Sequence, residues 1–400
     1  MMDSHQILIL LFIGYLVYTI DKKQKNFPAP LVLLLLGIVL SFIPFFESVH
    51  ITKAIIFEWF LPALLFISAY QFPFSHLKKH AGVTTVLSTV GLMLSALLLG
   101  GLLYVFSGPF LPLSFVGALL IASILTPTDP VSVVSILKQA SKDPKIADVV
   151  EGESMVNDGT SIVLFTLFAG MYLEGKTFSI SSFVYDFVLV SLGGIIIGAL
   201  FGWVVCRAIY VTHQRQYQVM LSIVLAYGSF YVAEQFGVSG VLSVVTAGIV
   251  LSFELERLIK ESHYREYLNS FWEVVEPSIL ALIFLLIGIE TTNYLAFDQW
   301  VFAGIIFVAS ILVRFLVLSG IIKSFPAWRK EFNWKDISLV TWSGIRGTMS
   351  VALLLSLESE YGSGDSTLIS LTFGAVLLSL VFQSLTIYPL SSYFERKAGY

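Results

Sequence analysis

Long apolar stretches separated by short polar loops recur along the whole chain. A helix needs about 20 apolar residues to cross the hydrocarbon core of a bilayer, and stretches near this length predict about thirteen membrane-spanning helices. Charged residues make up only 12% of the sequence and hydrophobic residues 56%, whereas an ordinary soluble chain carries about twice that charged fraction. The chain is therefore expected to be an all-α polytopic membrane protein. The expected spans are roughly 6–20, 30–47, 54–72, 82–106, 112–138, 149–173, 182–208, 217–235, 239–254, 272–290, 299–323, 336–357 and 366–390.

The basic residues predict how these helices are oriented. Cytoplasmic loops carry an excess of Lys and Arg, and nearly all 23 such residues fall on one side if the N-terminus lies outside. Lys53 and Lys176 fall on the outside, and Arg314 and Arg346 fall within spans. This pattern predicts a multi-pass protein of the cell membrane with its C-terminus in the cytoplasm. No loop is long enough for a soluble domain, so residues 1–400 are expected to form a single transmembrane domain.

Charged side chains deep within the spans indicate where the function lies. A charge at the centre of a bilayer costs about 2.5–3.5 kcal/mol even on a lenient scale, so it normally faces a cavity or a partner. The charged residues at this depth are Asp129, Glu153, Asp158, Arg314 and Arg346.

Conventional enzyme chemistry has little support in this sequence. All six histidines fall in termini or loops, and the single cysteine, Cys206, excludes a disulfide framework and a cysteine-based metal site. Metalloprotease spacing, a nucleophile elbow and a phosphate loop are absent. We therefore expect no enzyme activity, no cofactor and no nucleic-acid partner.

The fifth expected span contains TPTDP at residues 126–130. Pro127 and Pro130 each remove a backbone donor and clash with the preceding turn, so the helix is expected to break here. Unwound backbone at membrane depth occurs only where protein or a water-filled cavity surrounds it. The freed carbonyls, together with Thr128 and Asp129, would then provide oxygen ligands at the midplane.

The sixth expected span carries EGESMVNDGT at residues 151–160. Ser154 and Asp158 are four residues apart, as are Glu153 and Asn157, so each pair lies on one helical face. Hydroxyl, carboxylate and carbonyl oxygens are hard donors that suit Na⁺ or Li⁺ better than soft metals. A carboxylate in this setting can hold a proton or a cation, but hardly both.

The twelfth expected span is interrupted like the fifth. Gly344 and Gly347 flank Arg346, whose permanent charge needs a carboxylate or water. Two interrupted helices at matching places in two halves are typical of a transporter built from inverted six-helix repeats, with its site between them. The repeats would cover about 1–175 and 215–392, joined by a linker helix at about 182–208.

Several of these segments together resemble the signature segments of a known family. TPTDPVSV, EGESMVNDGTSIVLF, FLLIGIE, LVRFL and WSGIRGTMSVALLLSL are similar to those of the monovalent cation:proton antiporters, in the prokaryotic-type, electroneutral sodium/hydrogen exchanger branch. The likeness covers nearly the whole chain in the same order. One departure is Ile67, in LPALLFISA, where many members carry an acid.

The resemblance implies a role for each polar residue of the two central spans. Asp158 would be the exchanging carboxylate. Ser154 and Thr128 would ligate Na⁺, while Asn157 and Asp129 would line the site.

The resemblance also implies a structural ion pair. Glu153 would pair with a membrane arginine, and the sequence leaves open whether this is Arg314 or Arg346.

These expectations combine into one functional hypothesis, a secondary antiporter that exchanges Na⁺ (or Li⁺, or K⁺) for H⁺. It would be a homodimer in the lipid bilayer and would work by alternating access, rocking a broken-helix core against a dimerising scaffold. Because Asn157 does not titrate, one proton is expected per cation, without net charge transfer. The alternatives are a sodium-coupled symporter of the same architecture, a K⁺/H⁺ antiporter, a cation channel and a polytopic enzyme.

Overall fold

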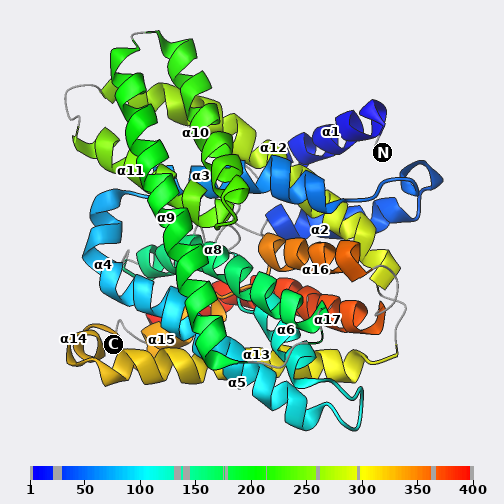
Figure 1. The fold of residues 1–400 in the computed structure, drawn as a ribbon. Coiled ribbons are helices and arrows are strands. Elements are labelled where there is room, and N and C mark those ends of the chain that lie inside the picture. The colour runs from blue at the N-terminus through cyan, green and yellow to red at the C-terminus, as the bar shows by residue number, and fades with distance from the viewer. Residues whose placement is uncertain are drawn as a thin grey trace.

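The computed structural model describes residues 3–20, 29–129, 137, 145–173, 175, 179–212, 214–257, 262–294, 298–361 and 366–396. Regular secondary structure in these residues is entirely helical (Figure 1). The helices are α1 (Ser4–Ile20), α2 (Ala29–Ser41), α3 (Leu61–Gln71), α4 (Phe74–Val86), α5 (Leu92–Phe106), α6 (Phe115–Ile124), α8 (Lys145–Leu173), α9 (Ile180–Val211), α10 (Arg215–Gln235), α11 (Gly240–Arg257), α12 (Ser262–Tyr294), α13 (Trp300–Ser324), α14 (Pro326–Glu331), α15 (Trp334–Trp342), α16 (Thr348–Tyr361), α17 (Ser366–Leu378) and α18 (Ser384–Arg396). Short π-helical segments at Ile55–Phe60, Leu87–Gly91 and Ser379–Gln383 precede or join some of them.

Several of these helices have the length and composition of membrane spans. Among the described residues, 6 helical stretches are long and apolar enough to cross a bilayer, and further apolar helices are shorter. The long stretches are Phe74–Phe106, Lys145–Leu173, Ile180–Ile209, Arg265–Thr292, Trp300–Ser324 and Thr367–Ser391. The chain is thus a helical membrane protein with several apolar spans.

Each expected span coincides with at least one observed helix, with some differences at the ends. The second expected span was set too long: α2 ends at Ser41 rather than near residue 47, and Pro44 begins a separate 3₁₀ turn. The tenth was set too short, because α12 continues through Pro277 from Ser262 to Tyr294. In the fifth expected span, Pro130 and the residues after it, apart from Leu137, lie outside the described residues. Lys176 also lies outside them.

The helices pack in two groups that meet along a seam. One group, here called the scaffold, comprises α1–α3 and α9–α12: α12 packs against α1, α2, α3 and α10, and α11 packs against α3, α9 and α10. The other group, here called the core, comprises α4–α6, α8 and α13–α17, with α6 against α5 and α8, and α13 against α5, α15 and α17. Figure 1 shows α1, α2, α10 and α12 in the upper part and α5, α6, α13 and α17 in the lower part.

Close backbone contact at glycines holds the scaffold together. A Cβ atom on Gly37 of α2 would lie 2.3 Å from the carbonyl oxygen of Leu285, and one on Gly198 of α9 would lie 2.2 Å from that of Ser243 on α11. Between helices in lipid there is little hydrophobic driving force, so small residues that permit such close packing stabilise the assembly. The scaffold is therefore a tightly packed frame against which the core is placed.

Candidate cation-binding site

Helix α6 ends inside the fifth expected span. Ile124 is its last residue, and residues 127–129 are non-helical. Pro127 disfavours helical geometry in the residue before it and cannot donate a backbone hydrogen bond, which explains the end of the helix. The segment that carries Thr128 and Asp129 is therefore free to present its backbone and side chains to neighbouring helices.

The twelfth expected span is interrupted at the place that the sequence indicated. Helix α15 ends at Trp342, helix α16 begins at Thr348, and residues 344–347 between them are non-helical. Gly344 and Gly347 bound this segment. Glycine costs a helix about 1 kcal/mol relative to alanine, so the pair weakens the helix here.

The two non-helical segments meet at Asp129. Its backbone N–H donates to the carbonyl oxygen of Ile345 at 2.8 Å. Its carboxylate Oδ2 accepts hydrogen bonds from the backbone N–H of Thr348 at 3.3 Å and from the Thr348 hydroxyl at 3.4 Å. A Cβ atom on Gly347 would lie 2.2 Å from the same Oδ2, so only glycine leaves room for the carboxylate. The start of α16 also favours negative charge through its helix dipole.

Helix α8 brings its polar face against Thr128. The hydroxyl of Ser154 donates a short hydrogen bond to the Thr128 carbonyl oxygen, and Nδ2 of Asn157 donates to Thr128 Oγ1 at 2.9 Å. Thr128, Ser154 and Asn157 are all buried. The structure thus places together three of the residues that the sequence suggested as cation ligands or lining residues.

Asp158 follows on the next turn of α8 and is half-buried. Its Oδ1 atom is inaccessible and accepts no hydrogen bond from any of the described residues. The carboxylate of Asp129 is close enough to interact with it electrostatically. An oxygen without a fixed donor is available to a proton or to a small cation, which makes Asp158 chemically distinct from every other acid in this region.

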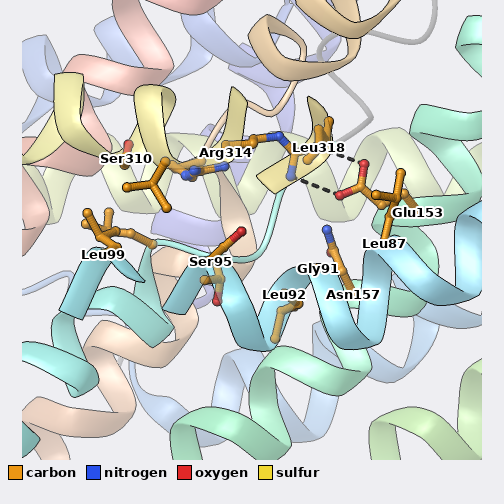
Figure 2. A pocket seen from close by; sticks show the side chains of 14 residues that line it. Leu87, Gly91, Leu92, Ser95, Leu99, Glu153, Asn157, Ser310, Arg314 and Leu318 are labelled. Carbon is orange, nitrogen blue, oxygen red and sulfur yellow. Dashed lines mark hydrogen bonds and ion pairs between the residues drawn. The ribbon is translucent and has the colours of Figure 1, made fainter. Parts of the chain in front are cut away.

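Glu153 pairs with Arg314, which answers the question that the sequence left open. Nη1 of Arg314 lies 2.9 Å from Oε1 of Glu153, and Nη2 lies 2.8 Å from Oε2, so the pair is bidentate. Both side chains are buried, and Figure 2 shows Arg314 of α13 reaching across to Glu153 of α8. A Cβ atom on Gly344 would lie 2.5 Å from Nε of Arg314, so this glycine leaves space for the guanidinium.

Arg346 is held differently from Arg314. Its Nη1 donates to the carbonyl oxygen of Gly344 at 2.9 Å, and its backbone N–H donates to Ser379 Oγ at 2.9 Å. No carboxylate of the described residues lies within ion-pair distance of it. It therefore places a buried positive charge just after the C-terminal end of α15, where the helix dipole is negative.

A small cavity lies beside these residues. Its volume of about 20 Å³ has room for about one water molecule. In Figure 2 the side chains of Asn157, Ser95 and Ser310 line it together with the Glu153–Arg314 pair. Neither Ser95 nor Ser310 could be selected from the sequence, because isolated serines are common in membrane helices.

Ile67 occupies the position at which the sequence departs from the family pattern. It lies on α3 of the scaffold and is 1% exposed, so it is part of the apolar packing.

Comparison with known proteins gives consistent results for the whole chain. The sequence profile of the family described as "Sodium/hydrogen exchanger, transmembrane" matches residues 7–392. The chain is 33% identical to the Na(+)/H(+) antiporter NhaH of Halobacillus aidingensis, over 96% of both proteins. It is 32% identical to the Na(+)/H(+) antiporter NhaP of Pseudomonas aeruginosa, over 84% of this chain and 80% of that protein. The solved structure of the sodium proton antiporter MjNhaP1 from Methanocaldococcus jannaschii has a TM-score of 0.75 at 23% identity, and the match covers 96% of each chain. At this identity the structural likeness concerns the fold.

Proposed function

Because the chain belongs to the sodium/hydrogen exchanger family, we propose that it exchanges one Na⁺ for one H⁺ at Asp158 by alternating access. It is a membrane transporter, not an enzyme, and Na⁺/H⁺ antiport is its activity. The observation that carries the proposed site is the Asp158 carboxylate, which has one oxygen without a hydrogen-bond donor among the described residues.

The oxygen atoms around Asp158 suit a small, hard cation. Asp158 supplies the charged ligand, while the Ser154 hydroxyl and the Thr128 carbonyl and hydroxyl supply neutral ones. Ser154 and Thr128 are already joined by a hydrogen bond, and the hydroxyl proton of Ser154 must rotate away when its oxygen binds a cation. A proton on Asp158 removes the negative charge that holds Na⁺, so the two ions compete for a single group.

The proposed stoichiometry follows from the two residues beside Asp158. Asn157 is an amide that stays uncharged, and its Nδ2 is already bonded to Thr128. The carboxylate of Asp129 accepts two hydrogen bonds from Thr348, at the start of α16. We propose that these bonds hold Asp129 in one protonation state through the cycle. Asp158 is then the only proton carrier, and the charge of the loaded site is the same with H⁺ as with Na⁺.

We also propose how the spans of the whole chain are arranged. Thirteen spans, with the N-terminus outside the cell membrane and the C-terminus in the cytoplasm, form two inverted repeats, about 1–175 and 215–392, joined by the linker helix at about 182–208. The interruption after α6 and that between α15 and α16 occupy matching positions in these repeats. We further propose that two copies associate through the scaffold, while the core moves.

Proteoliposomes with a pH-sensitive dye inside test the function. Added Na⁺ or Li⁺ should move protons, and parallel additions of K⁺ and Rb⁺ separate a Na⁺/H⁺ from a K⁺/H⁺ exchanger. Uptake of ²²Na⁺ without any pH change would instead support a sodium-coupled symporter. An absence of ion-dependent proton movement for every cation, in protein that is folded and correctly inserted, would contradict the proposed exchange.

A further inference from the structure

A partly buried polar contact joins the scaffold to the core near the ends of α12 and α16. The hydroxyl of Tyr294, on the last turn of α12, donates a short hydrogen bond to Oε2 of Glu358 on α16. The ring of Tyr294 packs against Phe373 of α17 with a centroid distance of 5.0 Å. Tyr294 is buried and Glu358 is half-buried. One scaffold side chain therefore contacts two helices of the core.

The position of this contact along α12 matters for transport. In the proposed orientation Tyr294 lies at the outer end of the helix. Residues 283–291 in the outer half of α12 are all buried, largely against α2 of the scaffold. Near the cytoplasmic end, by contrast, Glu273 and Val274 are exposed. At the level of Tyr294, the contacts with Glu358 and Phe373 bridge the seam between scaffold and core on the outside.

On the cytoplasmic side of the seam, Phe74 of α4 packs against Phe253 of α11 at a centroid distance of 4.9 Å, and the polar contact beside them is more exposed than that of Tyr294. There, Ser75 of α4 in the core donates to the carboxylate of Glu256 of α11 in the scaffold at 3.2 Å or more; Ser75 is exposed and Glu256 is half-buried. Both contacts are to a carboxylate, but the cytoplasmic one is more exposed and competes with water, which weakens it. The outer contact is accordingly the more stabilising of the two.

Tyr294 keeps its proton and so remains a donor. Burial raises the pKa of the Tyr294 hydroxyl well above its ordinary value, and the hydrogen bond to Glu358 and the negative charges of Glu358 and Glu290 raise it further. A phenol with a raised pKa stays protonated throughout the physiological pH range.

We propose that Tyr294 and Glu358 form an outer latch: their hydrogen bond holds the seam closed on the outside, and it breaks each time the ion site opens outward. The inference rests on the proposed alternating access, in which the core moves relative to the scaffold. Neither residue touches the ion site, so the latch sets the balance between inward-open and outward-open states rather than ion affinity.

A reversible cross-link tests whether the latch must open. Cysteines replace both residues (Tyr294→Cys with Glu358→Cys) in a Cys206→Ala background. The native side chains meet at their tips, so their Cβ atoms are farther apart than the about 3.5–4.5 Å of a disulfide, and a short bifunctional thiosulfonate is the suitable reagent. We expect the cross-linked protein in proteoliposomes to lose Na⁺/H⁺ exchange, and reduction to restore it.

A matched cross-link within the scaffold serves as the control. Tyr70 of α3 donates to Asn269 of α12 at 3.0 Å, and both helices belong to the scaffold. The pair Tyr70→Cys with Asn269→Cys, treated in the same way, should retain exchange. Exchange at the control rate by protein cross-linked at 294 and 358 would overturn the latch while leaving the antiport function intact. No exchange by the untreated wild-type protein would instead count against the proposed function.

A single substitution gives a second, independent readout. Tyr294→Phe keeps the ring against Phe373 but removes the hydrogen bond. Losing a hydrogen bond to a charged group should raise the outward-open population by about tenfold, because that state never contained the bond. The apparent KM for external Na⁺ should fall and that for cytoplasmic Na⁺ should rise. In the control variant Tyr70→Phe, both KM values should stay unchanged. Equal and unchanged KM values on both sides for Tyr294→Phe would contradict the latch.

Discussion

Two acids of α8, five residues apart, show how strongly the surroundings decide what a carboxylate can do. Glu153 gives both oxygens to Arg314 at 2.8–2.9 Å, whereas Asp158 has an oxygen without any hydrogen-bond donor among the described residues. A carboxylate fixed by a bidentate arginine cannot readily exchange ions. Asp158 retains that freedom, so the two residues are expected to respond differently to substitution.

Replacing Asp158 by Asn should abolish exchange while the protein still folds. The amide removes both the proton carrier and the charged cation ligand, but it keeps nearly the same shape. Dye-monitored exchange and size-exclusion chromatography measure the two properties in one preparation. Substantial exchange by well-folded Asp158→Asn protein would contradict the assignment of Asp158 as the exchanging carboxylate.

Replacing Glu153 by Ala should lower stability more than Asp158→Asn does. Removing one partner of a buried ion pair leaves the Arg314 charge uncompensated, which typically costs about 3–5 kcal/mol. Thermal melting of the two variants in detergent checks this. The double variant Glu153→Ala with Arg314→Leu should recover part of the loss, and identical melting curves for the two single variants would show that the pair contributes little.

At the scale of elements, the proposed site depends on two helices that end within expected membrane spans. The segment after α6 carries Thr128 and Asp129, and the segment before α16 carries Gly347, which lies directly beneath the Asp129 carboxylate. The backbone hydrogen bond from Asp129 to Ile345 fixes one segment relative to the other. Small changes at this crossing should therefore have large effects.

Replacing Gly347 by Ala tests this crossing. The added methyl group would lie 2.2 Å from Asp129 Oδ2 and must displace the carboxylate. A displacement of about 1 Å near a reacting group can cost about 100-fold in rate, and we expect a loss of exchange of that order. Gly320→Ala on α13 is the matched control, because its Cβ meets nothing within 4 Å. Equal exchange rates for the two variants would mean that the crossing tolerates distortion.

Much of this element-level description was predictable from the sequence. Apolar length predicted helices at each expected span, and Pro127 and the pair Gly344 and Gly347 indicated where two of them are interrupted. The short second span was not foreseen, because the apolar stretch continues past Ser41 and only Pro44 signals the turn. Hydropathy reports burial in lipid, not where a helix ends.

The partners of the charged residues were not predictable. Arg314 and Arg346 both lie in apolar stretches of the sequence, and the choice between them depends on which arginine the fold brings to Glu153 of α8. Tyr294 and Glu358 are 64 residues apart, and neither stands out from neighbouring polar residues near helix ends. Contacts of this kind arise from tertiary packing, about which the local pattern carries no information.

At the scale of the whole molecule, the proposed stoichiometry makes transport insensitive to the membrane potential. One H⁺ replaces one Na⁺ at Asp158, so no net charge crosses in a complete cycle. If Asp129 also titrated, it would couple to Asp158 and release a second proton per cation.

A potassium gradient with valinomycin, imposed on proteoliposomes, tests the stoichiometry. Neither the rate nor the end-point of Na⁺/H⁺ exchange should follow the imposed voltage. An end-point that shifts with voltage would mean that more than one proton moves per cation.

The Asp158 oxygen that has no hydrogen-bond donor among the described residues has one more consequence, which concerns movement of the core when no ion is bound. With neither ion bound, the core would carry an extra negative charge as it crosses between its two positions, at a cost of several kcal/mol. If this cost is about 3 kcal/mol, the empty protein would change sides about 100-fold less often than the loaded one. A carrier that rarely changes sides without a bound ion lets little Na⁺ cross unless H⁺ crosses in the opposite direction. In the proposed mechanism, the oxygen of Asp158 that accepts the ions thus also keeps their two movements coupled.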